Sequence, residues 1–355
     1  MSKFISDRFS DLEPYKPGEQ TGNTECIKLN TNESPYPPSP KVMEAISLQE
    51  VEKLNLYPDY SGINLRKKIA KLYNVSYENI VIGNGSDEVL SMIFMAFFDH
   101  KSTVVFPEIS YDFYKVFSQL YGIKYMEMPM NGDFSISFKD YLGINKDIIL
   151  ANPNAPTGIY LSLENIERII SSNPENLVVI DEAYIDYGGE SAYKLIDKYD
   201  NLLVVQTFSK SRSLAGARLG FAIGNRELIR DLNMIRFSMN PYNVNRLTLI
   251  AGESSIDDNE YYMKNCKEVM ETRSFVTEKL RSMGFQVIDS MTNFVFAKIK
   301  ALEGKILYEE LKKRGILVRR YDKELISNYL RITIGTKEQM EIFLQRIREI
   351  LKLKV

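Results

Sequence analysis

Histidine and cysteine are scarce in this sequence. His100 is the single histidine among 355 residues, and the two cysteines are Cys26 and Cys266. One histidine excludes most histidine-based metal sites and any catalytic triad assembled from several histidines, and we interpret His100 as a loop residue that ends an apolar helix. The two cysteines are far apart and lack CxxC or other metal-like spacing. We therefore expect no metal site.

A strong net charge and long apolar runs are also absent. The formal net charge is −2, which indicates neither a nucleic-acid partner nor a polybasic membrane contact, so an anionic substrate has to meet local cations. The N-terminal MSKFISDRFS lacks an apolar core of signal-peptide length. The most apolar stretch, VLSMIFMAFF (89–98), is too short to span a bilayer and predicts a core helix. We expect a cytoplasmic enzyme.

The sequence does contain a regular alternation of short apolar runs and helical patterns. Residues 1–40 are rich in Pro, Gly, Asn and Thr and predict an extended N-terminal arm. Over residues 41–247 strands alternate with helices, which predicts a large α/β domain with a mostly parallel central sheet covered by helices. The predicted strands lie in NIVIGNGSDE (79–88), STVVFPEIS (102–110), DIILANPNAPTG (147–158), NLVVIDEAY (176–184) and NLLVVQTFSK (201–210).

Residues 248–355 have a different pattern. Long charged amphipathic helices, over 259–284 and 337–354, flank the short strands FQVID, NFVFAKI and LRITIG. Helices and strands mixed in this way predict a smaller α+β domain that packs against the large one.

Each strand of the large domain is followed by unusual polar residues. Ligands of open parallel sheets bind outside the carboxyl ends of the strands, so five loops are expected to meet at one crevice. In the first loop, Gly83 and Gly85 suit either a plain tight turn or a phosphate at the start of a helix. A dinucleotide fingerprint is incomplete, because Glu88 stands where its third glycine would be.

Two other strand ends carry candidate chemistry. Asp181 ends a β-branched run, where it is either a helix cap or a buried carboxylate that holds a cationic ring nitrogen, and Tyr184 lies three residues on. Lys210 follows NLLVVQTF, a position at which most lysines are solvated, but Ser209 and Arg218 flank it as phosphate donors. An amine, a carboxylate, a phenol and a phosphate cradle in one crevice are what pyridoxal phosphate needs. The imine-forming lysine then requires a lowered pKa.

The sequence resembles the fold-type I pyridoxal-phosphate aminotransferases and, more narrowly, the class II branch of histidinol-phosphate aminotransferases. The likeness covers nearly the whole chain. It is carried by LEPYKPG (12–18), KLNTNESPYPP (28–38), NLYPDY (55–60), TFSKSRSLAGARLG (207–220) and LRITIG (330–335).

The resemblance implies roles for the cofactor-binding residues. It implies that Lys210 is the Schiff-base lysine and proton shuttle. It also implies that Asp181 pairs with the ring nitrogen of the cofactor and that Tyr184 hydrogen-bonds to the ring hydroxyl of the cofactor. The cofactor phosphate is expected to bind Ser209, Arg218 and the backbone of Ser86 and Asp87.

Three further cofactor contacts follow from the same resemblance. Tyr111 is expected to stack on the ring. Tyr57 is expected to reach the cofactor phosphate of the neighbouring subunit, which implies a homodimer with shared active sites. The family loop usually reads NPNNPTG, and its last asparagine contacts the ring hydroxyl, but this sequence has Ala155 there. The contact is therefore absent unless Asn154 supplies it.

The substrate residues are also implied by the resemblance. Arg331 matches the arginine that binds the anionic end of the substrate, and its guanidinium suits both carboxylate and phosphate. Arg319 matches a second arginine, although Arg320 competes for that role and a solvated strand end is the alternative for both. Tyr15 matches a phosphate-contacting tyrosine.

The implied reaction is a ping-pong transamination in histidine biosynthesis, from histidinol phosphate and 2-oxoglutarate to imidazole-acetol phosphate and glutamate. Three alternatives stay open. A threonine-phosphate decarboxylase shares the fold and cofactor, and an aromatic aminotransferase would line its pocket with some of the 22 Tyr and 18 Phe. A non-catalytic cofactor-sensing module would need a DNA-binding domain, for which the chain has neither spare length nor a basic stretch.

Overall fold

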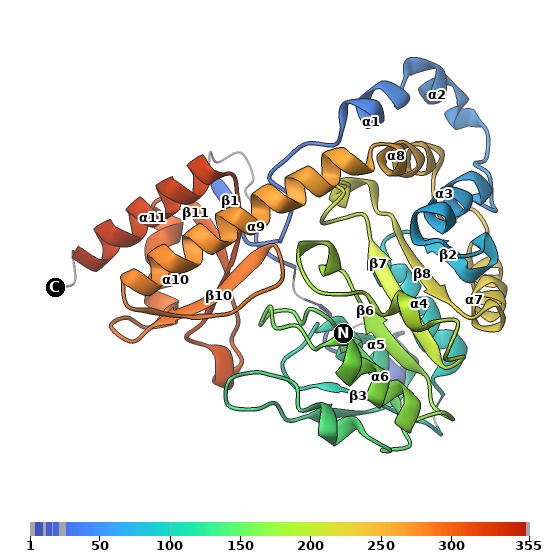
Figure 1. Cartoon of the computed structure of the whole chain (residues 1–355), viewed down its shortest axis with the longest axis horizontal. Helices are drawn as coiled ribbons and strands as arrows, with labels where there is room; N and C mark the ends of the chain where they lie inside the picture. Colours follow the sequence, from blue (N-terminus) through green and yellow to red (C-terminus); the bar gives the residue numbers. More distant parts are fainter. Residues whose placement is uncertain (1–3, 10–11, 16, 21–25, 100, 353–355) are drawn as a thin grey trace.

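The structure is a computed structural model that describes residues 4–9, 12–15, 17–20, 26–99 and 101–352. His100, which we predicted to lie in a loop, is outside these residues, as are parts of the predicted N-terminal arm. The described chain builds two sheets, each with its own helices, and the long helix α9 (Asn259–Ser282) runs from one part to the other (Figure 1).

The larger sheet has seven strands in the order β2-β8-β7-β6-β5-β3-β4. They are β2 (Ile80–Gly83), β3 (Thr103–Pro107), β4 (Lys124–Met128), β5 (Asp147–Ala151), β6 (Val178–Asp181), β7 (Leu202–Thr207) and β8 (Gly220–Gly224). The five predicted strands are all present, and β4 and β8 join them. Only β8 is antiparallel to its neighbours β2 and β7, so the five predicted strands run in one direction and end at one edge.

Alternate residues of these strands face two different cores. Ile148 and Val178 point into one core together with α3, α6 and α8, whereas Ile149 and Val179 point into the other together with α4, α5 and α7. The sheet is therefore covered on both faces, as the apolar strand runs predicted. The helices are α1 (Pro40–Ala45), α2 (Leu48–Glu52), α3 (Ile63–Tyr73), α4 (Ser86–Phe97), α5 (Phe113–Tyr121), α6 (Leu163–Ser172), α7 (Arg226–Met239) and α8 (Arg246–Asp257). The predicted core helix over 89–98 is thus confirmed within α4.

The smaller sheet has the order β1-β11-β12-β10-β9. Its elements are β1 (Ile27–Leu29), β9 (Phe285–Ile288), β10 (Phe294–Ile299), β11 (Ile316–Arg320) and β12 (Leu330–Thr333), with α9, α10 (Gly304–Lys313) and α11 (Lys337–Lys352) packed around them. Short 3₁₀ turns lie at Asp7–Phe9, Lys53–Asn55, Tyr77–Asn79, Phe138–Tyr141, Ile185–Tyr187, Ala192–Leu195, Ala215–Ala217 and Glu324–Ile326.

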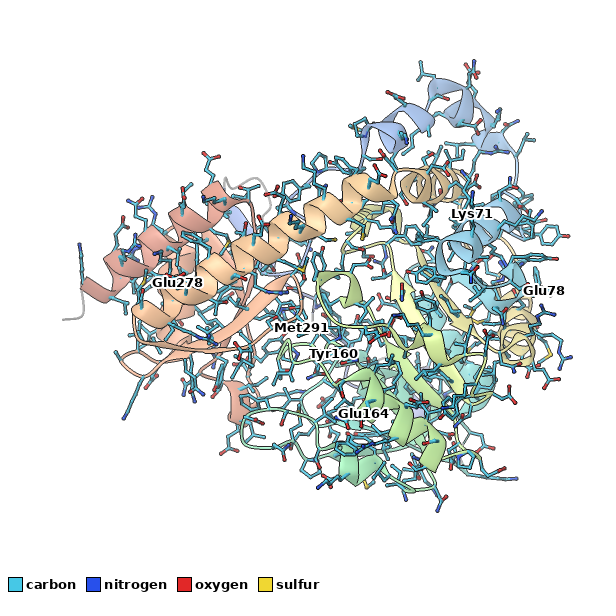
Figure 2. The ribbon with its side chains drawn as sticks, in the orientation of Figure 1. Lys71, Glu78, Tyr160, Glu164, Glu278 and Met291 are labelled. Atoms are coloured by element: carbon cyan, nitrogen blue, oxygen red, sulfur yellow. The ribbon has the colours of Figure 1, made fainter. Side chains whose placement is uncertain are left out.

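Two findings refine the expected organisation. Part of the predicted extended arm is a packed strand, because β1 pairs in parallel with β11 through Ile27 and Ile316. The predicted boundary after residue 247 falls inside α8, whose Leu249 packs in the core of the larger part. The two parts also meet at a junction where the backbone N–H of Met291 donates to the carbonyl of Gly158 over 2.8 Å, near Tyr160 (Figure 2).

None of the described helices is both long and apolar enough to cross a membrane.

Candidate active site

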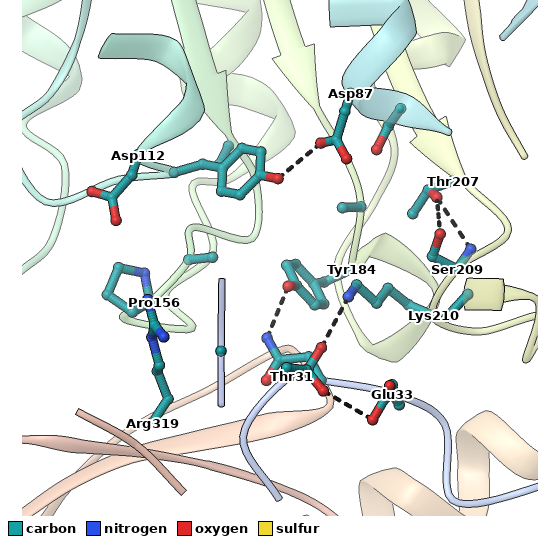
Figure 3. Close-up of a pocket in the computed structure, with 18 of the residues that line it drawn as sticks. Thr31, Glu33, Asp87, Asp112, Pro156, Tyr184, Thr207, Ser209, Lys210 and Arg319 are labelled. Atoms are coloured by element: carbon teal, nitrogen blue, oxygen red, sulfur yellow. Dashed lines mark hydrogen bonds between the residues drawn. The ribbon is translucent and has the colours of Figure 1, made fainter. Parts of the chain in front are cut away.

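A cavity of about 380 Å³ lies where the carboxyl ends of the parallel strands meet the smaller sheet and the segment after β1. Figure 3 shows labelled side chains from all three sources around it. The cavity brings together eleven of the residues that the sequence predicted: Tyr15, Ser86, Asp87, Tyr111, Asp181, Tyr184, Ser209, Lys210, Arg218, Arg319 and Arg331. Asn154 and Tyr57 do not line it.

Lys210 projects into the cavity from the turn that follows β7. The turn is fixed by Thr207, whose hydroxyl accepts a hydrogen bond from the backbone N–H of Ser209 (3.1 Å) and donates to the Ser209 hydroxyl (3.0 Å). The Lys210 amine donates to the carbonyl of Thr31 over 3.3 Å and lies 5.8 Å from the ring centroid of Tyr184 (Figure 3). Burial, reinforced by the positive charge of Arg331, lowers the pKa of Lys210 to about 8. The amine is therefore closer to its neutral, nucleophilic form than a solvated lysine is.

Asp181 is a buried carboxylate at the end of β6. It is 5% exposed, and it accepts hydrogen bonds from the Tyr114 hydroxyl (2.8 Å) and the backbone N–H of Ala183 (3.2 Å). Burial raises the pKa of Asp181 to about 6, although the bond from Tyr114 acts in the opposite direction. Among the described residues it forms no salt bridge within 4 Å. A carboxylate desolvated in this way is stabilised by a protonated nitrogen placed in the cavity.

The start of α4 and Arg218 form a cradle for an anion. Arg218 has a left-handed backbone (φ 57°), and its Nη2 donates to a carboxylate oxygen of Asp87 over 2.9 Å. Gly85 (φ 82°) precedes the helix, and a Cβ added there would lie 2.5 Å from Nη2 of Arg218. A Cβ at Gly220 would lie 2.3 Å from the backbone nitrogen of Ser86. Gly85 therefore lets the helix start approach the guanidinium, and Gly220 lets β8 approach the helix start, an arrangement suited to phosphate.

Two arginines enter the cavity from the smaller sheet. Arg319 on β11 and Arg331 on β12 are direct cross-strand partners. The Nη2 of Arg331 donates to the carbonyl of Asn30 over 2.8 Å, and its buried Nε has no partner among the described residues. Arg319 donates to the carbonyl of Pro17 over 3.1 Å. Because neighbouring residues of a strand point to opposite faces, Arg320 turns away and pairs with Asp322, so Arg319 is the arginine that lines the cavity.

Aromatic rings close the cavity beside the arginines. Tyr15 stacks on Phe113 with ring centroids 4.4 Å apart, and burial raises its pKa while Arg319 acts against that effect. The hydroxyl of Tyr111 donates to Asp87 over 2.8 Å, and burial raises the pKa of Tyr111 well above its usual value. Both tyrosines therefore stay neutral and offer apolar faces together with polar tips.

The structure changes the expectation for Asn154. Its side chain is fully buried outside the cavity, where its amide donates to the carbonyl of Ile109 (2.9 Å) and to the Thr157 hydroxyl (3.0 Å), and its oxygen accepts from Ser110 (3.1 Å). Through these bonds the Asn154 amide holds the loop after β5 in place. We therefore do not include Asn154 in the candidate site. Ala155 lines the cavity in its place.

Tyr57 lies on the surface. Its side chain is 77% exposed and stacks on Tyr242 with ring centroids 4.4 Å apart. It has no contact with the cavity of its own chain, which leaves the predicted contact with a neighbouring subunit as a proposal.

Sequence reasoning missed several residues of the site. Tyr114 supports Asp181, Asn32 donates to Tyr184, and Tyr321 lines the cavity beside the arginines. Tyr114 lies in the first turn of α5, three residues after Tyr111, and its closeness to Tyr111 in the chain was the available signal. Asn32 and Tyr321 gave no local signal, because their positions depend on how the smaller sheet packs.

The chain is similar to known aminotransferases over nearly its whole length. A family model described as aminotransferase class I and II matches residues 24–347. A histidinol-phosphate aminotransferase from Brachyspira hyodysenteriae is 51% identical and covers 99% of this chain and 100% of its own, and one from Clostridium botulinum is 48% identical and covers 99% of both.

Among solved structures, the histidinol-phosphate aminotransferase from Sinorhizobium meliloti in complex with pyridoxal-5'-phosphate has a TM-score of 0.88 at 24% identity, covering 98% of this chain and 100% of its own. This likeness confirms the predicted fold. The extent of the family match and the identity to full-length relatives go further: the chain belongs to the class I and II aminotransferases.

Proposed function

We propose that the protein is a pyridoxal-phosphate-dependent aminotransferase that transfers the amino group of L-histidinol phosphate to 2-oxoglutarate, giving imidazole-acetol phosphate and glutamate. Relatives that share about half of its residues over their full length are named histidinol-phosphate aminotransferases. The observation that carries the proposal is one cavity that holds a lysine of lowered pKa, a buried carboxylate and two arginines.

The residues of the cavity fit pyridoxal phosphate. Lys210 would hold the aldehyde carbon and Asp181 the ring nitrogen, since each is a desolvated group of the required charge. Arg218 and the first N–H groups of α4 would hold the phosphate, in a cradle that a Cβ at Gly85 would fill. When bound, the cofactor supplies an electron sink that acidifies the C–H bond next to the substrate nitrogen.

Lys210 is the proposed proton carrier of the reaction. A pKa of about 8 would allow its amine, at neutral pH, to take the proton from the substrate carbon and to deliver it to the former aldehyde carbon of the cofactor. Asp181 stays negative beside a cationic nitrogen, because an opposite charge favours the ionised carboxyl group. Tyr184 offers a hydroxyl in the same cavity, next to the lysine.

The two arginines suit the two different substrates. Histidinol phosphate carries a phosphate where an amino acid carries its carboxylate, so both anions have to bind in one place. Arg331 is held by a backbone carbonyl and leaves its Nε unpartnered, and a guanidinium binds either anion through paired N–H groups. Arg319 and Tyr15 add contacts that we assign to the phosphate.

The surface around Tyr57 supports a homodimer with shared active sites. Large apolar side chains are exposed on α1, on α2, on the segment that follows α2 and on α7, and we call this group the apolar ridge: Met43, Leu48, Leu54, Leu56, Tyr57, Met234 and Met239. Tyr57 is 77% and Leu48 82% exposed, and Tyr57 stacks on Tyr242 just after α7, so we propose that the ridge is one apolar surface of the kind that marks interfaces. A second subunit would cover the ridge and receive Tyr57 in its cavity.

We also propose that this enzyme is located in the cytoplasm.

A single half-reaction tests the proposed function. The protein is loaded with pyridoxal phosphate and mixed with L-histidinol phosphate without any keto acid, while the visible absorbance of the bound cofactor is followed. We expect a stoichiometric loss of absorbance that 2-oxoglutarate restores. L-threonine phosphate with carbon dioxide detection, and phenylalanine, are the controls for the decarboxylase and the aromatic enzyme. Absorbance that responds to either control but not to histidinol phosphate would contradict the proposal.

A further inference from the structure

A buried hydrogen bond joins the segment after β1 to the phenol of Tyr184. Asn32 is 1% exposed, and its Nδ2 donates to the Tyr184 hydroxyl oxygen over 2.8 Å. The two residues are 152 positions apart in the chain, and both line the cavity. The contact therefore links the smaller sheet to the lysine region through a side chain that the sequence did not single out.

The neighbours of Asn32 fix the orientation of its amide. The Thr333 hydroxyl oxygen accepts a hydrogen bond from the backbone N–H of Asn32 over 3.0 Å, and the same hydroxyl donates its hydrogen to the Asn32 Oδ1 over 3.0 Å. With its oxygen held by Thr333, the amide has to present its nitrogen to Tyr184. Asn32 also has a left-handed backbone (φ 57°), which asparagine tolerates better than most residues, and its carbonyl accepts from Asn293 over 2.9 Å.

This orientation determines what the phenol can do. A phenol hydroxyl has one hydrogen, and because its oxygen accepts from Asn32, that hydrogen is left to be donated elsewhere. In the described part of the chain no acceptor takes it. Accepting a bond also makes a hydroxyl a stronger donor, since linked hydrogen bonds polarise one another. Burial raises the pKa of Tyr184, and Arg331 and Asn32 both counteract that rise.

We propose that Asn32 is a positioning residue that holds the Tyr184 hydroxyl so that the phenol donates its hydrogen into the cavity, to the ring hydroxyl of the bound cofactor. This inference rests on the proposed function. Ala155 supports the inference. It lines the same cavity at the position where the family that this chain resembles has an asparagine, and its side chain has no hydrogen-bonding group. With Asn154 committed to its own loop, Tyr184 is the donor that remains, and its orientation depends on Asn32.

The test uses the holoenzyme without substrate. The visible absorbance of bound pyridoxal phosphate is titrated with pH in the wild type, N32A, Y184F and the double variant. Because a donor to the ring oxygen stabilises its deprotonated form, loss of the donor raises the midpoint. We expect a rise of about one pH unit for Y184F and about half a unit for N32A, the scale of a neutral hydrogen bond. In the Y184F background, N32A should add nothing.

Matched variants separate positioning from loosening of the fold. N293A removes a bond to the same segment without touching the phenol, and we expect a lower Tm with an unchanged midpoint. If N32A does not fold, T333V is the alternative variant. It removes the hydroxyl that holds the Asn32 oxygen, so the Asn32 amide can rotate, and we expect the midpoint of the absorbance titration to rise as in N32A.

Three outcomes overturn the inference: N32A leaves the midpoint unmoved while Y184F shifts it, the N32A shift persists in the Y184F background, or N293A shifts the midpoint equally. A wild type that gives no visible cofactor absorbance overturns the proposed function itself, and with it this inference.

Discussion

Two groups of residues in the cavity are built in different ways. The lysine group is Lys210, Asp181 and Arg218. It stands at the edge of the larger sheet, with Asp181 at the end of β6, Lys210 in the turn after β7 and Arg218 in the turn before β8. The arginine group, Arg319 and Arg331, stands on paired strands of the smaller sheet.

The two groups are also held by different partners. In the lysine group, Asp181 and Arg218 bond to helices that pack on the larger sheet, through Tyr114 and Asp87. The Lys210 amine donates to the carbonyl of Thr31, 179 residues away in the chain. In the arginine group, Arg331 bonds to the carbonyl of Asn30, which is 301 residues away in the chain. The reaction chemistry is thus built mainly on the larger sheet and its helices, whereas substrate recognition is built on the smaller sheet and the segment after β1. We expect changes in the first group to affect the rate of every substrate and changes in the second to affect substrates unequally.

The largest effect is expected for K210A. Removal of the amine eliminates both the attachment point of the cofactor and the proton carrier, so kcat should fall on the order of 10⁵-fold or more for every substrate. Steady-state turnover of histidinol phosphate and of glutamate measures the loss. K194A, which changes an exposed lysine paired with Glu190, is the control and should keep its activity. A K210A variant that retains measurable transamination would remove Lys210 from the mechanism.

D181N should reduce kcat about 10³-fold, again for both substrates, since it removes a preorganised charge without changing shape. Its neighbour provides a matched control. Glu182 is also buried, but it bonds to the backbone N–H of Ala192 over 2.7 Å and to Gln206 over 2.9 Å and does not line the cavity. E182Q should therefore affect the thermal midpoint more than kcat. Equal losses of kcat in the two variants would show that burial of a charge, and not contact with the ring nitrogen, explains the effect.

Variants of the arginine group should separate the substrates. R331Q should raise KM for both histidinol phosphate and glutamate by about 10- to 100-fold, the range of a hydrogen bond to a charged group. R319Q should raise KM for histidinol phosphate about 10-fold more than for glutamate, because we assign its contact to the phosphate. R320Q is the control on the same strand, and its KM values should stay within about twofold of the wild type, since Arg320 does not line the cavity and bonds to Ser327 and Asp322 instead. If R319Q changed KM for histidinol phosphate and for glutamate by the same factor, the assignment of Arg319 to the phosphate would be contradicted.

The distance in the chain between segments that contact one another explains what the sequence could predict. The five strand ends were predictable because each apolar run and its polar loop lie together in the chain. β8 was missed because GFAIG is short, bounded by glycine and antiparallel to its neighbours. β1 was missed because its pairing partner, β11, is almost the whole chain away. The choice between Arg319 and Arg320 needed the strand register, and the role of Asn32 needed its contact with Tyr184.

The pH dependence of cofactor uptake tests whether the two groups act on each other. The neutral amine of Lys210 is the reactive form, and its pKa is lowered from the ordinary 10.5 to about 8 by burial and by Arg331. Uptake of pyridoxal phosphate by the cofactor-free protein should therefore rise with pH to a midpoint near 8. In R331Q a positive neighbour is lost, which favours the protonated amine, so the pKa of Lys210 and the midpoint should move upward. Stopped-flow absorbance at constant ionic strength measures both profiles, with R320Q as the control. An R331Q midpoint equal to that of the wild type would mean that burial alone sets the reactivity of the lysine and that the arginine group contributes only recognition.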